Sequence, residues 1–337
     1  MGNESLKVFI WIEWCYVPEP KAAKVELVMK FLSIGRHENL FFSVKRLIDK
    51  GHQLSGIVTD LAPPEYKIQI QDFVEFAKIN GSPILISSDN LEIARFIETL
   101  GNVDIGVSVN HRRIINKDVI DLFPLGILNL HGGDLPRYRG NACQAWAIIN
   151  GEARIGACVH KMMPDILDSG SIISRDYLDI NDETKIQEVF DWFEIKSPDL
   201  FEDAIEKLAV DSKYEIQKSN DGNLRSHRCY ERRPEDGRIK WEDDAKKIIR
   251  LINASGSPYP GAYTFLGDKK VSVVDATRAV LFEDISAIPG QVIQVNRNSI
   301  LVACGDNQAV EIFKISINLE KNITPSKFLS STRLRFH

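Results

Sequence analysis

The residues best suited to chemistry in this sequence are an asparagine and a histidine at the end of an apolar stretch. Asn129 and His131 belong to LNLHGGDLPRYRG, residues 128–140, where GILNL reads as a short buried strand that leads into a glycine turn. On a regular strand, residues two apart project from the same face. Either residue alone is better explained by hydrogen bonds to loop backbone. Together they predict a site that acts on one small group.

A third polar residue, Asp168 in the loop DILDSG, precedes a later strand-like run. An amide N–H can hold a developing oxyanion, and a histidine can move a proton near neutral pH. A carboxylate can orient that histidine or stabilise its charged form. The set therefore suits acyl transfer to an amine from an activated donor, which needs no serine or cysteine nucleophile.

A different class of function uses some of the same residues. His131, Asp134 and Asp168 could also be drawn as ligands in a metal-dependent, deacetylase-like hydrolase. That set lacks a further ligand at a motif spacing and leaves Asn129 without a role. A chelator would separate the two hypotheses, and a non-catalytic scaffold is the third.

The elements that must position these residues alternate between strand-like and helix-like periodicity. The strand candidates are short apolar runs at 30–35, 54–60, 83–87, 103–110 and 126–130. The helix candidates lie between them, at 39–51, 70–81, 89–100 and 116–123. This rhythm predicts an α/β fold with a doubly wound, mostly parallel sheet. A TIM barrel would need eight such units, and too few are present.

The rest of the chain divides into further segments. A helix over 141–152, strand-like runs at 154–163 and 169–180, and a helix over about 183–210 complete the first domain. Beyond residue 255, short strands separated by Gly and Pro predict a smaller β-barrel-like domain. We therefore expect an N-terminal extension, a catalytic domain, a linker and a β-rich domain, at 1–28, 29–218, 219–254 and 255–337.

Composition narrows the class of protein. The 337 residues carry a formal net charge of −5, which gives no electrostatic case for a nucleic-acid or anionic-membrane partner. Five scattered cysteines without a C-x-x-C pair predict neither a disulfide framework nor a thiolate zinc site. The early apolar run VFIWIEWCYV is too short to span a membrane and lacks the features of a signal peptide. Cytoplasm is the expected compartment.

The segment GILNLHGGDLPRYRGNACQAWAIINGE, followed by DILDSG, resembles the formyltransferases that use 10-formyltetrahydrofolate. That group contains methionyl-tRNA, glycinamide ribonucleotide and sugar-nucleotide N-formyltransferases. Its pattern is N-x-H at a strand end, a loop ending in L-P-x-x-R-G, a helix and a later D-x-G. YERRPEDGRIKW and SPYPGAYTF resemble the linker and the start of the C-terminal barrel in the longer members. The similarity covers residues 29 to about 330.

The resemblance implies a catalytic triad that works without a metal. Asn129 would polarise the formyl carbonyl and hold the oxyanion, and His131 would take or relay the proton of the attacking amine. Asp168 would orient this exchange, directly or through water. The folate co-substrate would lie against the strand end VSVNHRRI and the loop before Asp168, where the candidate contacts are Asn110, Arg113 and Asp165.

Candidate residues for binding the acceptor are Asp134, Arg137 and Tyr138. Where many relatives have S-L-L before the proline, this chain has a carboxylate at Asp134, which could accept hydrogen bonds from an ammonium or a sugar hydroxyl, or cap the turn. Arg137 and Arg139 could hold a phosphate or a folate glutamate tail, or brace the turn. We expect His111, His160 and Trp146 to be structural.

The acceptor is inferred from charge. In the resemblance, tRNA-modifying members carry a basic insertion after the second strand, whereas the short, nearly neutral DLAPPEYK stands here. Binding a tRNA requires several Lys and Arg to neutralise phosphates. The net charge is −9 over 1–210 and +4 over 211–337. We therefore expect a nucleotide-linked amino-dideoxy sugar, made for a surface glycan such as a lipopolysaccharide O-antigen. Initiator methionyl-tRNA is the alternative acceptor, and a homodimer is left open.

The first 28 residues stand apart from this pattern. VPEPKAAKVELV has no evident strand partner, and the resemblance begins at Met29. We expect residues 1–28 to be dispensable for folding and activity.

Overall fold

The computed structural model describes residues 28–164, 166–216, 226–317 and 320–337. The expectation for the N-terminal extension falls almost entirely outside these residues. Within the described ranges, no helix combines the length and apolar character needed to cross a membrane.

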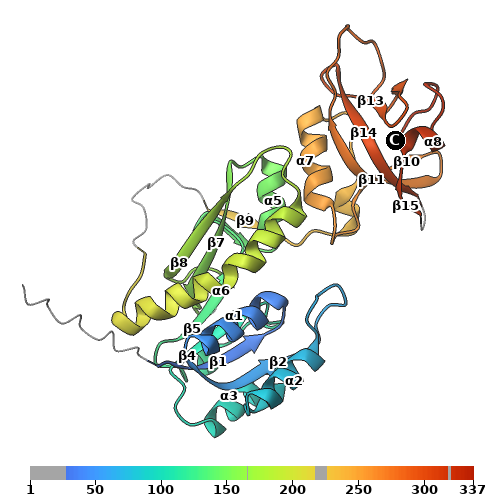
Figure 1. Ribbon diagram of the computed structural model, residues 1–337. Helices are drawn as coiled ribbons and strands as arrows, with labels where there is room; N and C mark the ends of the chain where they lie inside the picture. The colour runs from blue at the N-terminus through green and yellow to red at the C-terminus, as the bar shows by residue number, and fades with distance from the viewer. Residues whose placement is uncertain (1–27, 165, 217–225, 318–319) are drawn as a thin grey trace, which may run out of the picture.

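A seven-stranded sheet forms the centre of the first domain (Figure 1). Its order is β3-β2-β1-β4-β5-β7-β8. The first five strands in this order are parallel, and β7 and β8 are antiparallel additions. The strands are β1 (Lys30–Gly35), β2 (Gln53–Thr59), β3 (Ile84–Ile86), β4 (Ile105–Val109), β5 (Ile127–His131), β7 (Arg154–Lys161) and β8 (Ile172–Asp179). The mostly parallel, doubly wound sheet predicted from the sequence is confirmed.

Helices cover both faces of this sheet, which explains why its central strands are almost wholly apolar. One face packs against α1 (Glu38–Asp49), α2 (Ile70–Ile79) and α6 (Ile186–Val210). The other packs against α3 (Asn90–Thr99) and α4 (Lys117–Ile120). Strand β4 is buried at all five positions. Charged side chains of the central strands are therefore expected only where the strands end.

The chain order of the sheet changes direction between β1 and β4. Ligands of open α/β sheets bind beyond the carboxyl ends of the strands, near such a reversal. Strand β5 is the neighbour of β4 and pairs Asn129 with Ser108. After β5 the chain forms a loop, the short strand β6 (Tyr138–Gly140) and helix α5 (Cys143–Asn150). The sequence therefore delivers Asn129 and His131 to the edge of the sheet where binding is expected.

The second domain is a curved antiparallel sheet with its own core. Its strands are β10 (Ala262–Leu266), β11 (Lys269–Arg278), β12 (Val292–Val295), β13 (Ile300–Cys304), β14 (Gln308–Ile317) and β15 (Glu320–Ile323), followed by α8 (Pro325–Phe328). The chain end closes this sheet: Phe265 and His337 exchange two backbone hydrogen bonds of 3.0 Å, and Phe336 N–H donates to Gly290 at 2.8 Å. This closure accounts for the predicted barrel-like character.

The segment between the domains differs from the predicted linker over 219–254. It contains β9 (His227–Cys229), which pairs with β6, a 3-10 turn (Pro234–Gly237) and helix α7 (Ala245–Ser255). Apolar residues of α7 and the buried Trp241 belong to the core of the second domain. A linker has no such core, so the second domain includes residues before 255. The amphipathic pattern of α7 is the physical reason for the difference.

Candidate active site

Strand register brings four polar side chains together at the carboxyl end of β5. Asn129 and His131 project from the same face, as predicted. Strand β7 runs antiparallel to β5 and places His160 directly opposite Asn129. The fourth side chain is Asp168, from the loop between β7 and β8. The three predicted residues therefore do lie together, and His160 joins them.

Asp168 lies between the two imidazole rings. One carboxylate oxygen, Oδ2, is 3.5 Å from Nδ1 of His131, and the other, Oδ1, is 3.6 Å from Nε2 of His160. The backbone N–H of Gly140 donates to Oδ2 at 2.9 Å. Asp168 adopts a left-handed backbone conformation, with φ of 53°, which an aspartate tolerates better than most side chains. This conformation turns the buried carboxylate toward both histidines.

The hydrogen bonds assign a proton to each imidazole ring. Nε2 of His131 lies 2.9 Å from the carbonyl oxygen of Tyr138, which can only accept, so Nε2 carries the hydrogen. In the neutral ring, Nδ1 is then the basic atom, and it faces Asp168. By the same argument Nδ1 of His160 donates to Lys161 O, and its Nε2 accepts from the Asn129 amide at 3.2 Å. Asn129 retains a second N–H for a ligand.

Burial lowers the pKa of His131 below its ordinary value of 6.5, although the Asp168 charge opposes this shift. Burial raises the pKa of the Asp168 carboxyl, but His160 and His131 in their protonated forms, together with the Gly140 amide, more than offset this effect and lower that pKa. At neutral pH the site therefore contains a neutral imidazole base beside an ionised carboxylate. This pair can take one proton and hold it as an ion pair.

Gly133 allows the loop to pass close to His131. A Cβ at this position would lie 2.6 Å from His131 Nε2 and 2.6 Å from the Tyr138 carbonyl oxygen. Both distances are too short for any side chain. A larger residue would therefore push apart His131 and the Tyr138 carbonyl and break the hydrogen bond that fixes the proton on Nε2. Gly133 thus fixes the ring geometry by its small size.

His160 was expected to be structural because the sequence offered no clear partner for it, and the structure places its ring in the candidate site. Its ring is only 2% exposed and contacts both Asn129 and Asp168. A signal for it exists in the sequence: it is a polar residue that directly follows the apolar run IGACV. What the sequence does not give is the antiparallel register that sets it opposite Asn129.

We expect His160→Ala to lower kcat on the order of tenfold, because a lost hydrogen bond to a buried group costs about 1–3 kcal/mol. The substitution leaves the Asn129 amide without its acceptor and removes one neighbour of Asp168. His160→Asn, which keeps a short polar side chain, should recover part of the rate. Steady-state kinetics on both variants test this, and a wild-type kcat for His160→Ala would show that the contact is only structural.

The predicted acceptor-binding residues have partners within the chain. Arg137 makes a two-pronged ion pair with Glu152, at 2.6 and 2.5 Å. Tyr138 is 3% exposed, and its hydroxyl contacts Glu152 at 2.7 Å. The structure therefore does not present the Tyr138 side chain to a ligand, and Tyr138 serves the site through its backbone carbonyl. The Arg137 side chain is 35% exposed and already paired. Asp134 accepts from the Tyr177 hydroxyl at 3.0 Å and does not cap a helix.

The predicted folate contacts lie on the loop after β4. Asn110 is exposed and its amide donates to the Tyr66 hydroxyl at 3.4 Å. Arg113 is exposed and pairs with Asp89 at 3.4 Å. Asp165 falls outside the described residues. The structure does not bring Asn110 or Arg113 into contact with the residues around His131.

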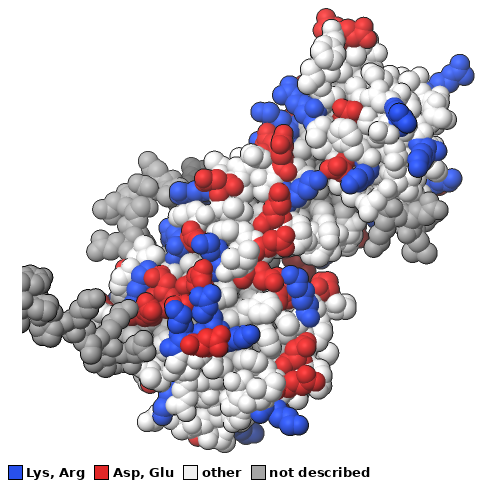
Figure 2. Space-filling model, in the orientation of Figure 1, with Lys and Arg blue, Asp and Glu red and all other residues white. Residues whose placement is uncertain are grey.

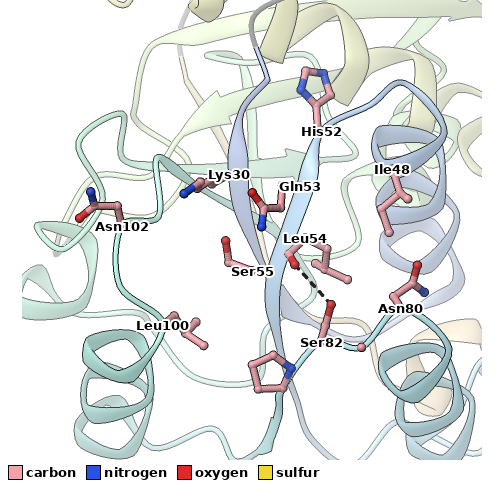
Figure 3. Close-up of a pocket in the computed structure, with 12 residues that line it drawn as sticks. Lys30, Ile48, His52, Gln53, Leu54, Ser55, Asn80, Ser82, Leu100 and Asn102 are labelled. Atoms are coloured by element: carbon pink, nitrogen blue, oxygen red, sulfur yellow. Dashed lines mark hydrogen bonds between the residues drawn. The ribbon is translucent and has the colours of Figure 1, made fainter.

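A separate cavity of about 360 Å³ lies at the opposite edge of the sheet (Figure 3). It is lined by the first residues of two strands, Lys30 of β1 and Gln53 of β2, and by Ser82, whose hydroxyl donates to Leu54 O at 3.3 Å. These positions mark the amino ends of the strands, away from His131. This cavity is therefore not the site described above.

Comparison with known proteins agrees with this geometry. Residues 87–205 match the family model "Formyl transferase", and residues 232–333 match "Formyl transferase, C-terminal domain". Methionyl-tRNA formyltransferase of Ruminiclostridium cellulolyticum is 28% identical over 284 residues, which is 82% of this chain and 89% of that protein. The two family matches together cover about two thirds of the chain.

Solved structures show the same fold at low sequence identity. An N-formyltransferase from Helicobacter canadensis, in complex with folinic acid and dTDP-3-aminofucose, superposes with a TM-score of 0.60 at 15% identity, covering 85% of this chain and 99% of that one. HypX from Aquifex aeolicus, in complex with tetrahydrofolic acid, gives a TM-score of 0.58 at 16% identity. The match covers 90% of this chain and 47% of HypX, so the chain spans about half the length of that protein.

The two family matches fall on the two domains, and the catalytic-domain match contains the cluster of Asn129, His131, His160 and Asp168. The chain belongs to the formyl transferase family and is a formyl-transferring enzyme.

Proposed function

We propose that this enzyme moves the formyl group of 10-formyltetrahydrofolate to the amine of a nucleotide-linked amino-dideoxy sugar, as a step in surface-glycan synthesis, and does so without a metal. The observation that carries the proposal is the cluster of Asn129, His131 and Asp168, with the basic Nδ1 of His131 facing the carboxylate at 3.5 Å. This set provides an oxyanion donor and a proton acceptor beside a single reacting carbon.

The residues define a stepwise transfer. The acceptor amine attacks the formyl carbon, and the free N–H of Asn129 donates to the oxygen as it becomes negative. His131 Nδ1 takes the proton that the attacking nitrogen loses, and Asp168 stabilises the imidazolium. The carbonyl then reforms, the bond from carbon to N10 of the folate breaks, and that nitrogen receives the proton. The products are the formylated amine and tetrahydrofolate.

Exposed apolar side chains support the folate assignment. Ile114, on the loop after β4, is 73% exposed, and Met163, Ile166 and Leu167, before Asp168, are each at least half exposed. The two loops flank the end of β5, so an aromatic ligand could cover these side chains while it presents its reactive atom to His131. Two solved neighbours, HypX and the Helicobacter canadensis enzyme, are also complexes with folates.

Charge supports a small acceptor over a tRNA. Figure 2 shows acidic and basic side chains intermixed over the described part of the visible face. At the two ends of the segment DLAPPEYK, Arg36 lies 3.7 Å from Asp60, and Lys67 pairs with Glu194 at 2.5 Å. Cations paired in this way are less free to neutralise nucleic-acid phosphates. A methionyl-tRNA acceptor is the second candidate, because two relatives at 28% identity are named methionyl-tRNA formyltransferases.

The acceptor is tested by side-by-side assay of 10-formyltetrahydrofolate with dTDP-3-aminofucose, with UDP- and GDP-linked 3- and 4-amino sugars, and with charged initiator methionyl-tRNA. Tetrahydrofolate release and the mass of the formylated product are measured. We expect a sugar to be preferred and the rate to survive a chelator. Faster formylation of the tRNA would overturn the sugar assignment, and loss of turnover on chelation that added metal restores would overturn the metal-free mechanism.

A further inference from the structure

The loop from Gly133 to Pro136 is fastened to β7 and β8 by side chains outside the cluster. The Cys158 thiol donates to Gly133 O at 3.4 Å. The Arg175 guanidinium donates through Nη2 to Leu135 O at 2.8 Å. Gly156 lets the loop lie flat on β7, since a Cβ there would sit 2.8 Å from the Asp134 Cα. The loop therefore depends on the sheet for its position.

Arg175 makes the central contacts that hold this loop. Its Nη1 donates to the Tyr177 hydroxyl at 2.9 Å, and that hydroxyl donates to Asp134 Oδ1 at 3.0 Å. One guanidinium thus holds Leu135 directly, and it holds Asp134 both through a tyrosine and through an ion pair in which Nη1 lies 3.9 Å from Oδ1. Register places Arg175 opposite Cys158, and Cys158 opposite His131, so all three project from the same face of the sheet. The fork geometry of arginine allows both bonds at once, which a lysine cannot reproduce.

The fastened loop leads directly to the catalytic groups. Asp134 O accepts from Tyr138 N–H at 2.9 Å. The carbonyl of Tyr138 accepts from His131 Nε2 at 2.9 Å, and the N–H of Gly140 donates to Asp168 at 2.9 Å. A shift of the loop would therefore move the acceptor that fixes the proton of His131 and the donor that orients Asp168.

The guanidinium is also incompletely satisfied. Its Nε is buried and, within the described residues, makes no hydrogen bond. A buried polar group without a partner opposes stability, so this arginine is a costly choice if its role is only to stabilise the fold. The loss of stability from the unpaired Nε is explained if the two hydrogen bonds from Nη1 and Nη2 are needed to position the loop.

We propose that Arg175, acting through Tyr177 and the loop from Gly133 to Pro136, is a positioning residue for His131 and Asp168. The inference rests on the proposed function of those two residues. Misplacing reacting groups by about 1 Å can cost on the order of a hundredfold in rate. Arg175 touches neither reacting atom in this arrangement, so its loss should lower kcat and leave the KM for 10-formyltetrahydrofolate nearly unchanged.

The test compares Arg175→Met, Arg175→Lys and Tyr177→Phe in the full chain, with the fastest acceptor of the panel above. We expect kcat to fall on the order of a hundredfold in Arg175→Met and about tenfold in Arg175→Lys, which can keep one of the two bonds. Tyr177→Phe keeps the ring beneath Arg154 but loses the hydroxyl, so its kcat should also be about tenfold lower than that of the wild type. Arg46→Gln, which breaks ion pairs with Glu202 and Asp199 on the far helices, is the matched control and should keep the wild-type kcat.

A second readout separates positioning from general structural support. A loosened loop admits water to His131, so the pKa of its imidazole should rise toward the ordinary value in the Arg175 variants. The proton NMR titration of that ring, assigned by its absence in His131→Asn, measures this in the protein without ligand. Wild-type kcat and titration in Arg175→Lys and Tyr177→Phe would overturn the proposal, even if Arg175→Met failed to fold. A change confined to KM would overturn it as well. Full activity in His131→Asn would instead refute the proposed function.

Discussion

His131→Ala is expected to lower kcat by at least about a hundredfold, because a positioned general acid or base typically contributes that much or more. The substitution removes the neutral Nδ1 that faces Asp168 at 3.5 Å and would take the proton of the attacking amine. Asn129 would still polarise the formyl group, so a residual rate should remain. Initial-rate measurements of tetrahydrofolate release at saturating acceptor provide the test.

The pH dependence of the wild-type enzyme follows from the same residue. The neutral form of His131 is the base, and burial lowers its pKa below 6.5. Activity should therefore be at its plateau at pH 7 and be lost only as the pH falls through this lowered pKa. The same shift affects folding: the unfolded chain binds this proton near pH 6.5 and the folded chain does not, so stability should decline below that pH.

The control for His131→Ala is His337→Ala, since His337 lies at the end of the second domain and stacks on Phe265 at 6.0 Å. The control should keep the wild-type rate, and both variants should retain a cooperative thermal transition. Full activity in a folded His131→Ala protein would remove this residue from the mechanism. A His131 ring whose proton NMR titration lies at or above pH 6.5 would show that its pKa is not lowered.

The sequence predicted those residues of the site whose placement follows from spacing along a single strand or from a local motif. Asn129 and His131 are two apart on a strand end, so period-two geometry is enough to place them together. Asp168 was singled out as a carboxylate in the loop before a strand-like run, and the D-x-G of the family pattern then implied its role. The parallel sheet followed from alternating strand and helix periodicity, because burial on both faces leaves each central strand almost wholly apolar.

Other contacts depend on tertiary register and could not be predicted this way. His160 enters the site only because β7 pairs antiparallel to β5, and no local pattern encodes that pairing. Tyr138 was expected to bind a ligand through its side chain, yet its backbone carbonyl is the part that contacts His131. The backbone is the same in every residue type, so its role is invisible to reasoning from side-chain chemistry.

Asp168→Asn is expected to lower kcat by at least about a hundredfold, the other large effect we foresee. Asparagine is nearly the same size and tolerates the left-handed conformation with φ of 53°. Its amide oxygen can still accept from Gly140 N–H, so the loop and the fold should be retained. What is lost is the negative charge that stabilises the imidazolium of His131 during proton transfer. Kinetics together with a thermal melt measure both consequences.

The pH profile distinguishes this electrostatic role from a purely structural one. The charge of Asp168 raises the pKa of His131 against the effect of burial, so its removal should lower that pKa further. The acidic limb of the rate profile should therefore move to lower pH in Asp168→Asn, opposite to the shift expected for the Arg175 variants. Asp121→Asn, which breaks an exposed ion pair with Lys117 on α4, is the matched control and should change neither rate nor profile. A low rate with an unmoved acidic limb would mean that Asp168 holds the loop but does not supply charge to His131.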